Sequence, residues 1–199
     1  GYMMNFIKQI YGLFNGSKDD GCVKAAMKKY FDALETLYKD KTGDLPYFPY
    51  DPTLPPIIYV GSPTKEEWIR WRAVEKGTVT DLTKLEEQLH IKFHSSIFEY
   101  FNSYWFAFLN GTVAESECEL LPVLPGREID EFVTLQYQYS QYCASLNRPM
   151  KYTPIGSEVE SSNAIVVNNI NGKVFVEDIE SQSYKLISKS LASFIEMLI

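Results

Sequence analysis

The segment 96–108 constrains the fold most, because bulky apolar residues occupy most of its positions. On a helix these side chains would cover most of the circumference, and a helix that is apolar nearly all round is usually buried. Asn110-Gly111 is typical of a helix end. We therefore predict a central, buried helix over 96–108. Its apolar side chains are Ile97, Phe98, Tyr100, Phe101, Tyr104, Trp105, Phe106 and Phe108.

A shorter helix is predicted just before this segment. Thr80 and Asp81 are both good helix caps, and the leucines that follow recur at helical spacing. Leu82, Leu85 and Leu89 would then point inward. We expect the two helices together to supply most of the core.

His90 and His94 lie between these helices, four residues apart, which on one helix would place two metal ligands on one face. Ser96-x-x-Glu99 argues against that arrangement, because it is a capping box and indicates that a new helix begins at Ser96. The chain has no third histidine, so a nearby glutamate would have to complete the site. We predict no metal site and no cofactor.

The first part of the chain predicts a helix followed by an extended connection. Residues 20–40 have helical apolar spacing, with Asp20 as the cap. Residues 43–63 contain six prolines, which favour an extended segment packed on the domain, although a proline-rich tract can also be a peptide ligand. Ile57–Val60 could form a short edge strand, and Trp68–Val74 is predicted to be extended.

Residues 4–14 form a further amphipathic pattern, which predicts a short helix within an N-terminal extension over 1–20. This helix could dock on the domain, touch a membrane surface or mediate self-association. Its only basic residue is Lys8, which favours docking over membrane binding. The domain itself is predicted to span 21–199.

The last part of the chain mixes helices and strands. A helix is expected from Asp130 to about Leu146, and Asn171-Gly172 is a strong hairpin signal between strands at 164–167 and 173–177. A final helix should begin at Ser188 or Ser190. The order lacks regular βαβ alternation and therefore indicates an α+β fold: a single domain with one mainly antiparallel sheet packed by helices.

Charge is unevenly distributed along the chain. Residues 1–80 hold 11 Lys/Arg and 10 Asp/Glu, whereas residues 81–199 hold 8 Lys/Arg and 16 Asp/Glu. The second part, with a net charge of −8, would repel nucleic acid and attract a basic protein partner. The alternative is that the acids only keep the protein soluble.

Two acidic groups follow the aromatic segment. Glu115, Glu117 and Glu119 alternate along a predicted strand, where three glutamates on one face indicate a face that is solvated or contacts cations. The second group is at the predicted helix start at Asp130, where acids also complement the helix dipole. It comprises Glu128, Asp130 and Glu131.

Three widely separated cysteines and the lack of a signal peptide or membrane span favour a cytoplasmic protein. The order of motifs resembles the SUKH superfamily, and within it the Syd branch, known as SecY-interacting proteins. The resemblance covers roughly 22–199. Its motifs are Tyr30-Phe31-Asp32-Ala33-Leu34, Leu45-Pro46, Trp68–Arg72, the helices on either side of His90, Leu120-Leu121-Pro122-Val123, the acidic helix start, Pro154-Ile155-Gly156, Asn171-Gly172 and Leu191-Ala192-Ser193-Phe194-Ile195.

The resemblance implies an α+β fold without a cofactor that binds protein partners. Syd proteins are expected to present an acidic concave surface to basic cytosolic loops of the SecY translocon, and other SUKH members are immunity proteins against bacterial toxins. On the family pattern, Glu128, Asp130 and Glu131 match the acidic helix start, and Asp32 and Glu35 match the early-helix acids. His90 departs from the pattern, because the superfamily often has glycine there.

Three functions are consistent with these patterns. We first expect an immunity protein whose acidic surface covers a basic toxin domain, such as a nuclease. The alternative is a Syd-like regulator that binds SecY loops and associates with the cytosolic face of the plasma membrane only through that partner. The third function, a hydrolytic enzyme, is a remote alternative, because the sequence contains no catalytic motif and no pair of carboxylates stands out.

Overall fold

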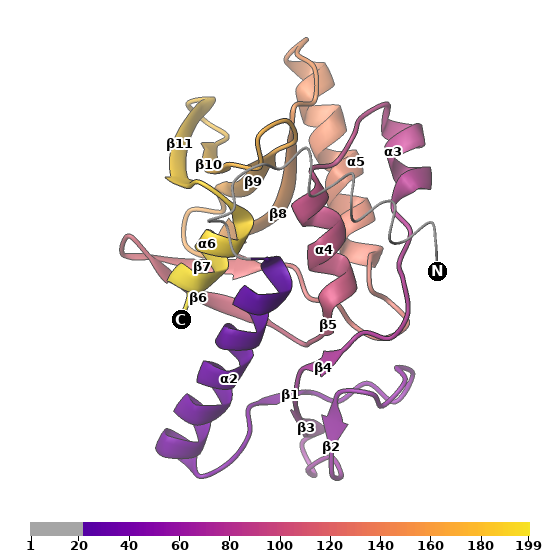
Figure 1. Ribbon diagram of the computed structural model, residues 1–199, viewed down its shortest axis with the longest axis vertical. Coiled ribbons are helices and arrows are strands. Elements are labelled where there is room, and N and C mark those ends of the chain that lie inside the picture. The colour runs from indigo at the N-terminus through magenta and orange to yellow at the C-terminus, as the bar shows by residue number, and fades with distance from the viewer. Residues whose placement is uncertain (1–21) are drawn as a thin grey trace.

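The computed structural model describes residues 22–199, and Figure 1 shows their arrangement. A six-stranded antiparallel sheet, in the order β11-β10-β9-β8-β7-β6, forms the body of the domain. A three-stranded sheet, β1-β3-β2, forms a smaller lobe, and β4 pairs with β5. The elements are α2 (Val23–Thr42), β1 (Tyr47–Pro49), β2 (Tyr59–Val60), β3 (Trp68–Trp71), β4 (Val74–Glu75), α3 (Thr83–Leu89), α4 (Ser95–Ser103), β5 (Tyr104–Trp105), β6 (Leu109–Val113), β7 (Ser116–Leu120), α5 (Asp130–Ser145), β8 (Tyr152–Glu158), β9 (Ala164–Asn168), β10 (Val174–Asp178), β11 (Ser183–Ser188) and α6 (Leu191–Met197).

Helices α5 and α6 pack directly on the six-stranded sheet, as an α+β fold requires. Helix α6 contacts β6 and β11 and packs against α2, which in turn packs on α4. Helix α5 contacts β8, where the buried Gln136 donates a hydrogen bond to the Pro154 carbonyl. The predicted fold class is therefore confirmed. None of the helices within residues 22–199 combines the length and the apolar character that a membrane span requires.

Aromatic side chains from the predicted central segment fill the core. Phe101 lies 4.5 Å from Phe132 of α5 between ring centroids, and Phe106 lies 5.1 Å from Phe31 of α2. Both Phe101 and Phe106 are completely buried. Such ring pairs add to the stability that burial alone provides, so this segment joins three helices into one core.

The helix predicted over 96–108 is nevertheless too long. Helix α4 ends at Ser103, and Tyr104–Trp105 forms strand β5, which pairs with β4. Asn110-Gly111 lies inside strand β6 rather than at a helix end. A run of apolar residues fits a buried strand as well as a buried helix, and here the backbone pairing decided for the strand.

His94 begins helix α4, which corrects the predicted capping box. Its Nδ1 accepts a hydrogen bond from the Ser96 backbone N–H, so His94 and not Ser96 is the N-cap. Glu99 accepts from the Lys24 N–H at the start of α2, 75 residues away. The break at His90 is confirmed, since His90 has a φ of 55° and ends α3. No cluster of three His, Cys, Asp or Glu side chains suited to a metal ion occurs within residues 22–199.

The first part of the chain largely follows the prediction. Helix α2 covers most of 20–40, with Cys22 as its N-cap, while the predicted cap Asp20 lies outside the described residues. Within the possible strand at 57–60 only Tyr59–Val60 forms β2, and within the extended segment predicted at 68–74 Trp68–Trp71 forms β3. The helix predicted at 4–14 also lies outside the described residues.

The last part of the chain confirms the long helix, the hairpin and the final helix. Strands β9 and β10 pair antiparallel across the turn that contains Asn171-Gly172, and Ser190 caps α6. Gly172 has a φ of 74°, and a Cβ there would lie 2.4 Å from Cε1 of His94. The hairpin turn therefore packs directly on the histidine that begins α4. Strands β8 and β11 were not predicted.

Candidate functional site

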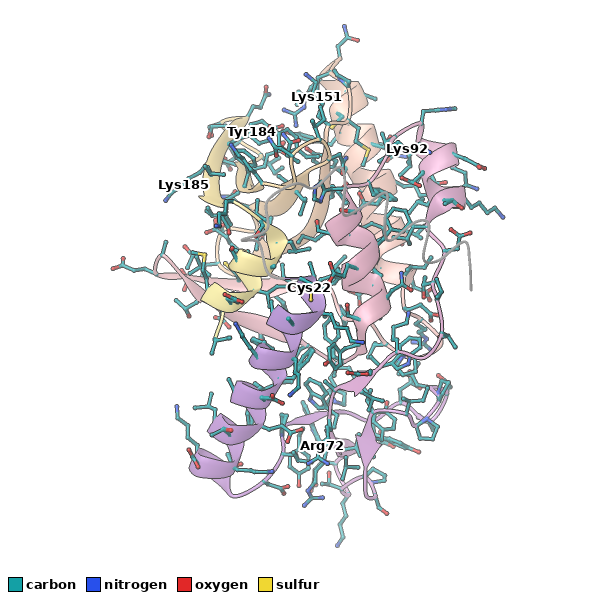
Figure 2. The ribbon with its side chains drawn as sticks, in the orientation of Figure 1. Cys22, Arg72, Lys92, Lys151, Tyr184 and Lys185 are labelled. Atoms are coloured by element: carbon teal, nitrogen blue, oxygen red, sulfur yellow. The ribbon has the colours of Figure 1, made fainter. Side chains whose placement is uncertain are left out.

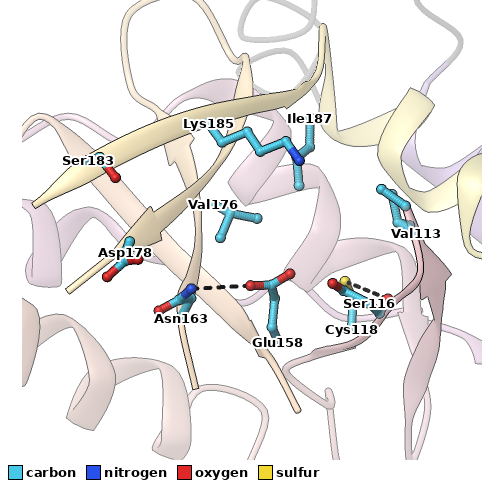
Figure 3. A pocket seen from close by; sticks show the side chains of 11 residues that line it. Val113, Ser116, Cys118, Glu158, Asn163, Val176, Asp178, Ser183, Lys185 and Ile187 are labelled. Carbon is cyan, nitrogen blue, oxygen red and sulfur yellow. Dashed lines mark hydrogen bonds between the residues drawn. The ribbon is translucent and has the colours of Figure 1, made fainter. Parts of the chain in front are cut away.

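A hollow of about 250 Å³ lies on the concave face of the six-stranded sheet (Figure 3). Along β10, alternate side chains face this side: Val174 is buried in the core, whereas Val176 and Asp178 line the hollow. Strand β10 therefore contributes to the core at one end and to the open hollow at the other. The lining residues are Val113, Ala114, Ser116, Cys118, Glu158, Asn163, Val176, Asp178, Ser183, Lys185 and Ile187.

Two carboxylates form the acidic side of this hollow. Glu158 ends β8, and its Oε1 accepts hydrogen bonds from Ser161 Oγ at 3.0 Å and Asn163 Nδ2 at 3.3 Å. Asp178 ends β10, and its Oδ1 accepts from the backbone N–H groups of Glu180 and Ser181. Within residues 22–199, the second oxygen of each carboxylate accepts no hydrogen bond. One oxygen thus orders a turn, and the other is available to a partner.

Lys185 and Cys118 complete the chemistry of the hollow. Lys185 projects from β11 along the upper rim, and Cys118 lies at the other side on β7 (Figure 3). Burial raises the pKa of the Cys118 thiol, and the nearby Glu158 charge raises it further. Because the thiolate is the nucleophilic form, this thiol is poorly suited to covalent chemistry. Two carboxylates against one ammonium leave a net charge of −1, which suits a cationic side chain.

The acids predicted on the strand after Thr112 belong to the hairpin β6–β7. Glu115 lies in its turn, with a φ of 68°, and is exposed. Glu117 and Glu119 are exposed on β7, whereas Cys118 between them is buried. Because neighbouring residues of a strand point to opposite faces, these two glutamates face away from the hollow. This exposure is consistent with both alternatives, a solvated face and a face that contacts cations of a partner.

The acids predicted at a helix start do open helix α5. Asp130 and Glu131 are exposed in its first turn, and Glu128 is half-buried just before it. There they complement the helix dipole. Arg127 beside them pairs with Asp51 at 3.4 Å. Within the described chain no ion pair involves Asp130 or Glu131, so their charge faces solvent.

The two acids predicted on the early helix are already paired. Asp32 accepts from Lys28 Nζ at 2.7 Å, one helical turn away. Glu35 accepts from Arg72 Nε at 2.7 Å and lies 3.8 Å from Lys39 Nζ. Figure 2 shows Arg72 in the lower lobe, far from Lys185 on β11. A partner would therefore have to replace these cations.

The predicted acids lie on three separate elements. In Figure 1 the β6–β7 turn projects at the left of the molecule, whereas α5 begins at the right. None of the eight lines the hollow, whose carboxylates, Glu158 and Asp178, the sequence reasoning missed. A strand pattern at 152–158 would have found Glu158, and Asp178 directly follows the predicted strand 173–177. Only the pairing of β7, β8, β9 and β10 places both in one hollow.

Comparison with known proteins identifies relatives along nearly the whole described chain. The family model for Syd protein (SUKH-2) matches residues 24–199. A protein Syd from Shewanella loihica is 25% identical over 178 residues, covering 87% of this chain and 80% of the relative. A protein Syd from Alteromonas mediterranea is 26% identical over 152 residues, covering 75% and 82%. The resemblance inferred from the motifs is therefore confirmed, and the chain belongs to the Syd protein (SUKH-2) family.

Proposed function

We propose that this protein is a non-enzymatic, Syd-like module that binds basic cytosolic loops of the SecY translocon. Its membership of the Syd family over residues 24–199 carries the proposal. The relatives named protein Syd favour this function over the immunity function that we expected first. On this proposal the protein is cytoplasmic and reaches the plasma membrane through its partner.

Two groups of acids are proposed to meet the basic loops. The first is the hollow, where Glu158 and Asp178 each keep an oxygen available. The second is the set of eight acids expected from the sequence, of which Asp130 and Glu131 are exposed in the first turn of α5. Opposite charges at such a surface speed association and add specificity more than they add affinity. Salt should therefore weaken binding.

Flotation with vesicles tests the proposal. Wild-type protein should float with vesicles that carry the SecY complex and remain unbound with empty vesicles of the same lipids. Raising the salt should reduce the bound fraction, because exposed charges are screened over a Debye length of about 8 Å at physiological ionic strength. Equal binding to both kinds of vesicle would overturn the proposal.

Charge reversal then tests the acids at the start of α5. Changing Glu128, Asp130 and Glu131 to lysine should reduce binding to the loaded vesicles by about tenfold, which corresponds to about 1.4 kcal/mol. The matched control changes three other exposed acids, Asp40, Glu66 and Glu67, to lysine. The net charge changes equally in both variants. Equal loss in the two would show an effect of total charge alone.

The immunity function has its own test. A basic toxin encoded beside this gene would be expressed with and without this protein. Protection of the cells, together with failure to bind the loaded vesicles, would replace the SecY proposal with the immunity function. Enzymatic activity is no part of either proposal.

A further inference from the structure

The two edge strands of the six-stranded sheet, β6 and β11, differ in whether other parts of the chain cover their outer side. At the β6 edge, the Tyr30 hydroxyl accepts from the Asn110 N–H at 3.0 Å and donates to the Asn110 carbonyl at 2.6 Å. Beside it, Gly111 packs so closely on the end of α6 that a Cβ would lie 2.4 Å from the Leu198 carbonyl oxygen. Helices α2 and α6 thus lie against this edge, and Tyr30 of α2 satisfies the backbone groups of Asn110.

The β11 edge is open within the described chain. Strand β11 pairs with β10 alone, and no backbone hydrogen bond joins its outer side to another segment of residues 22–199. From Ser183 to Leu186 the pairing with β10 is regular, and the register shifts only toward Ser188. Leu186 is 53% exposed. An edge of this kind is a template for another extended chain.

This open edge also borders the acidic hollow. Ser183, Lys185 and Ile187 line the hollow from β11, and Asp178 pairs directly with Ser183 across the sheet (Figure 3). A strand added beyond β11 would lie about 4.8 Å from it and place every second side chain on this concave face. A lysine or arginine in that strand is long enough to reach Asp178.

We propose that β11 binds an extended basic segment of the partner as a seventh strand, with its alternate side chains over the hollow. This inference rests on the proposed function and specifies how the basic loop is held. Backbone hydrogen bonds would supply affinity and the hollow would supply specificity, as in other cases of strand addition. The basic residue faces Ser183 and Asp178 and not Lys185, because like charges directly opposite one another are unfavourable.

Synthetic peptides test this mode of binding. The probe is a ten-residue extended peptide with lysine at every fourth position and threonine elsewhere, so that no lysine needs to face Lys185. It is compared with two copies N-methylated on one or the other set of alternate amides. An added strand donates every second N–H to its neighbour. Methylating the pairing set should therefore weaken binding at least tenfold, whereas methylating the other set leaves it within about twofold. Equal losses from both would overturn the inference.

Amide hydrogen exchange on the full chain locates the peptide. Binding should protect alternate backbone amides between Ser183 and Ser188, and Asp178→Asn should weaken the peptide several-fold. As a matched control, Asp40→Asn removes an exposed charge on α2 and should leave affinity unchanged. Binding without protection of β11, or pairing of β11 with a second copy of the chain, would overturn the inference.

These outcomes are separable from those of the proposed function. If SecY-loaded vesicles bind the protein while the β11 amides remain unprotected from exchange, the SecY function is supported and strand addition is contradicted. If the peptide protects the β11 amides but the SecY-loaded vesicles do not bind the protein, the SecY function is contradicted and the binding site at the β11 edge is supported.

Discussion

Glu177 and Asp178 are neighbours on β10, yet their carboxylates lie in opposite environments. Glu177 is completely buried against α5, where Tyr139 donates to its Oε1 at 2.6 Å and Arg148 pairs with its Oε2. The Arg148 guanidinium in turn lies over the rings of Tyr142 and Tyr184. Asp178 lines the open hollow on the other face.

These two neighbours differ in role: the Glu177 carboxylate is part of the buried core, and the Asp178 carboxylate is available to a partner. A buried carboxylate is tolerated only when a cation and hydrogen bonds compensate for its lost hydration, and Glu177 has both. Because both oxygens of the Glu177 carboxylate already have partners within the fold, neither is available to another protein. Asp178 is only half-buried, and its Oδ1 accepts hydrogen bonds from two backbone N–H groups of the following turn. Net charge in a sequence therefore says little about binding until burial is known.

The largest effect is expected at the buried ion pair. Arg148→Ala should lower the free energy of unfolding by about 3 kcal/mol, because Glu177 would keep its buried charge without a cation. Denaturant unfolding followed by circular dichroism measures this. The double variant Arg148→Ala/Glu177→Gln should recover part of the loss. A change below about 0.5 kcal/mol for Arg148→Ala would mean that the pair resembles a surface pair.

Tyr139→Phe should cost about 1–3 kcal/mol, because it removes a hydrogen bond to a buried carboxylate. Burial and the hydrogen bond to Glu177 raise the pKa of Tyr139. The fold thus favours the neutral phenol, so this stabilisation is complete below the ordinary pKa of about 10 and is lost as the pH rises through the folded-state pKa. Unfolding from pH 8 to 11 should show a steeper decline for wild type than for Tyr139→Phe. Parallel curves would contradict this.

The smallest effect on stability is expected in the hollow. Glu158→Gln and Asp178→Asn together keep the oxygen atoms that order the turns, so the free energy of unfolding should change by no more than about 0.5 kcal/mol. The same double variant should bind SecY-loaded vesicles about five- to thirtyfold more weakly, because two partly exposed ion pairs contribute roughly 0.5–1 kcal/mol each. Unfolding and flotation on one sample measure both. A large loss of stability with unchanged binding would reverse the roles assigned to the two faces of β10.

Local patterns in the sequence determined much of the fold. Apolar spacing located α2, α3 and α6, the acids at 130–131 located the start of α5, and Asn171-Gly172 located the hairpin between β9 and β10, because these features depend on residues close together in the chain. The order of such features was enough to reveal the Syd resemblance. It was also enough to place Asp130 and Glu131 in the first turn of a helix.

Contacts between distant segments decided what the local patterns left open. Helix α4 ends at Ser103 because Val74–Glu75 pairs with Tyr104–Trp105, and Glu99 caps α2 rather than its own helix. Glu158 and Asp178 look like any other strand-end acids until antiparallel pairing curls β7 to β11 around one hollow. Period-two spacing establishes that neighbours on a strand point to opposite faces, but only the packing of α5 determines which face is buried. The sequence therefore determined the number of acidic side chains and their positions along the chain. The tertiary structure decided which of these side chains a partner can reach.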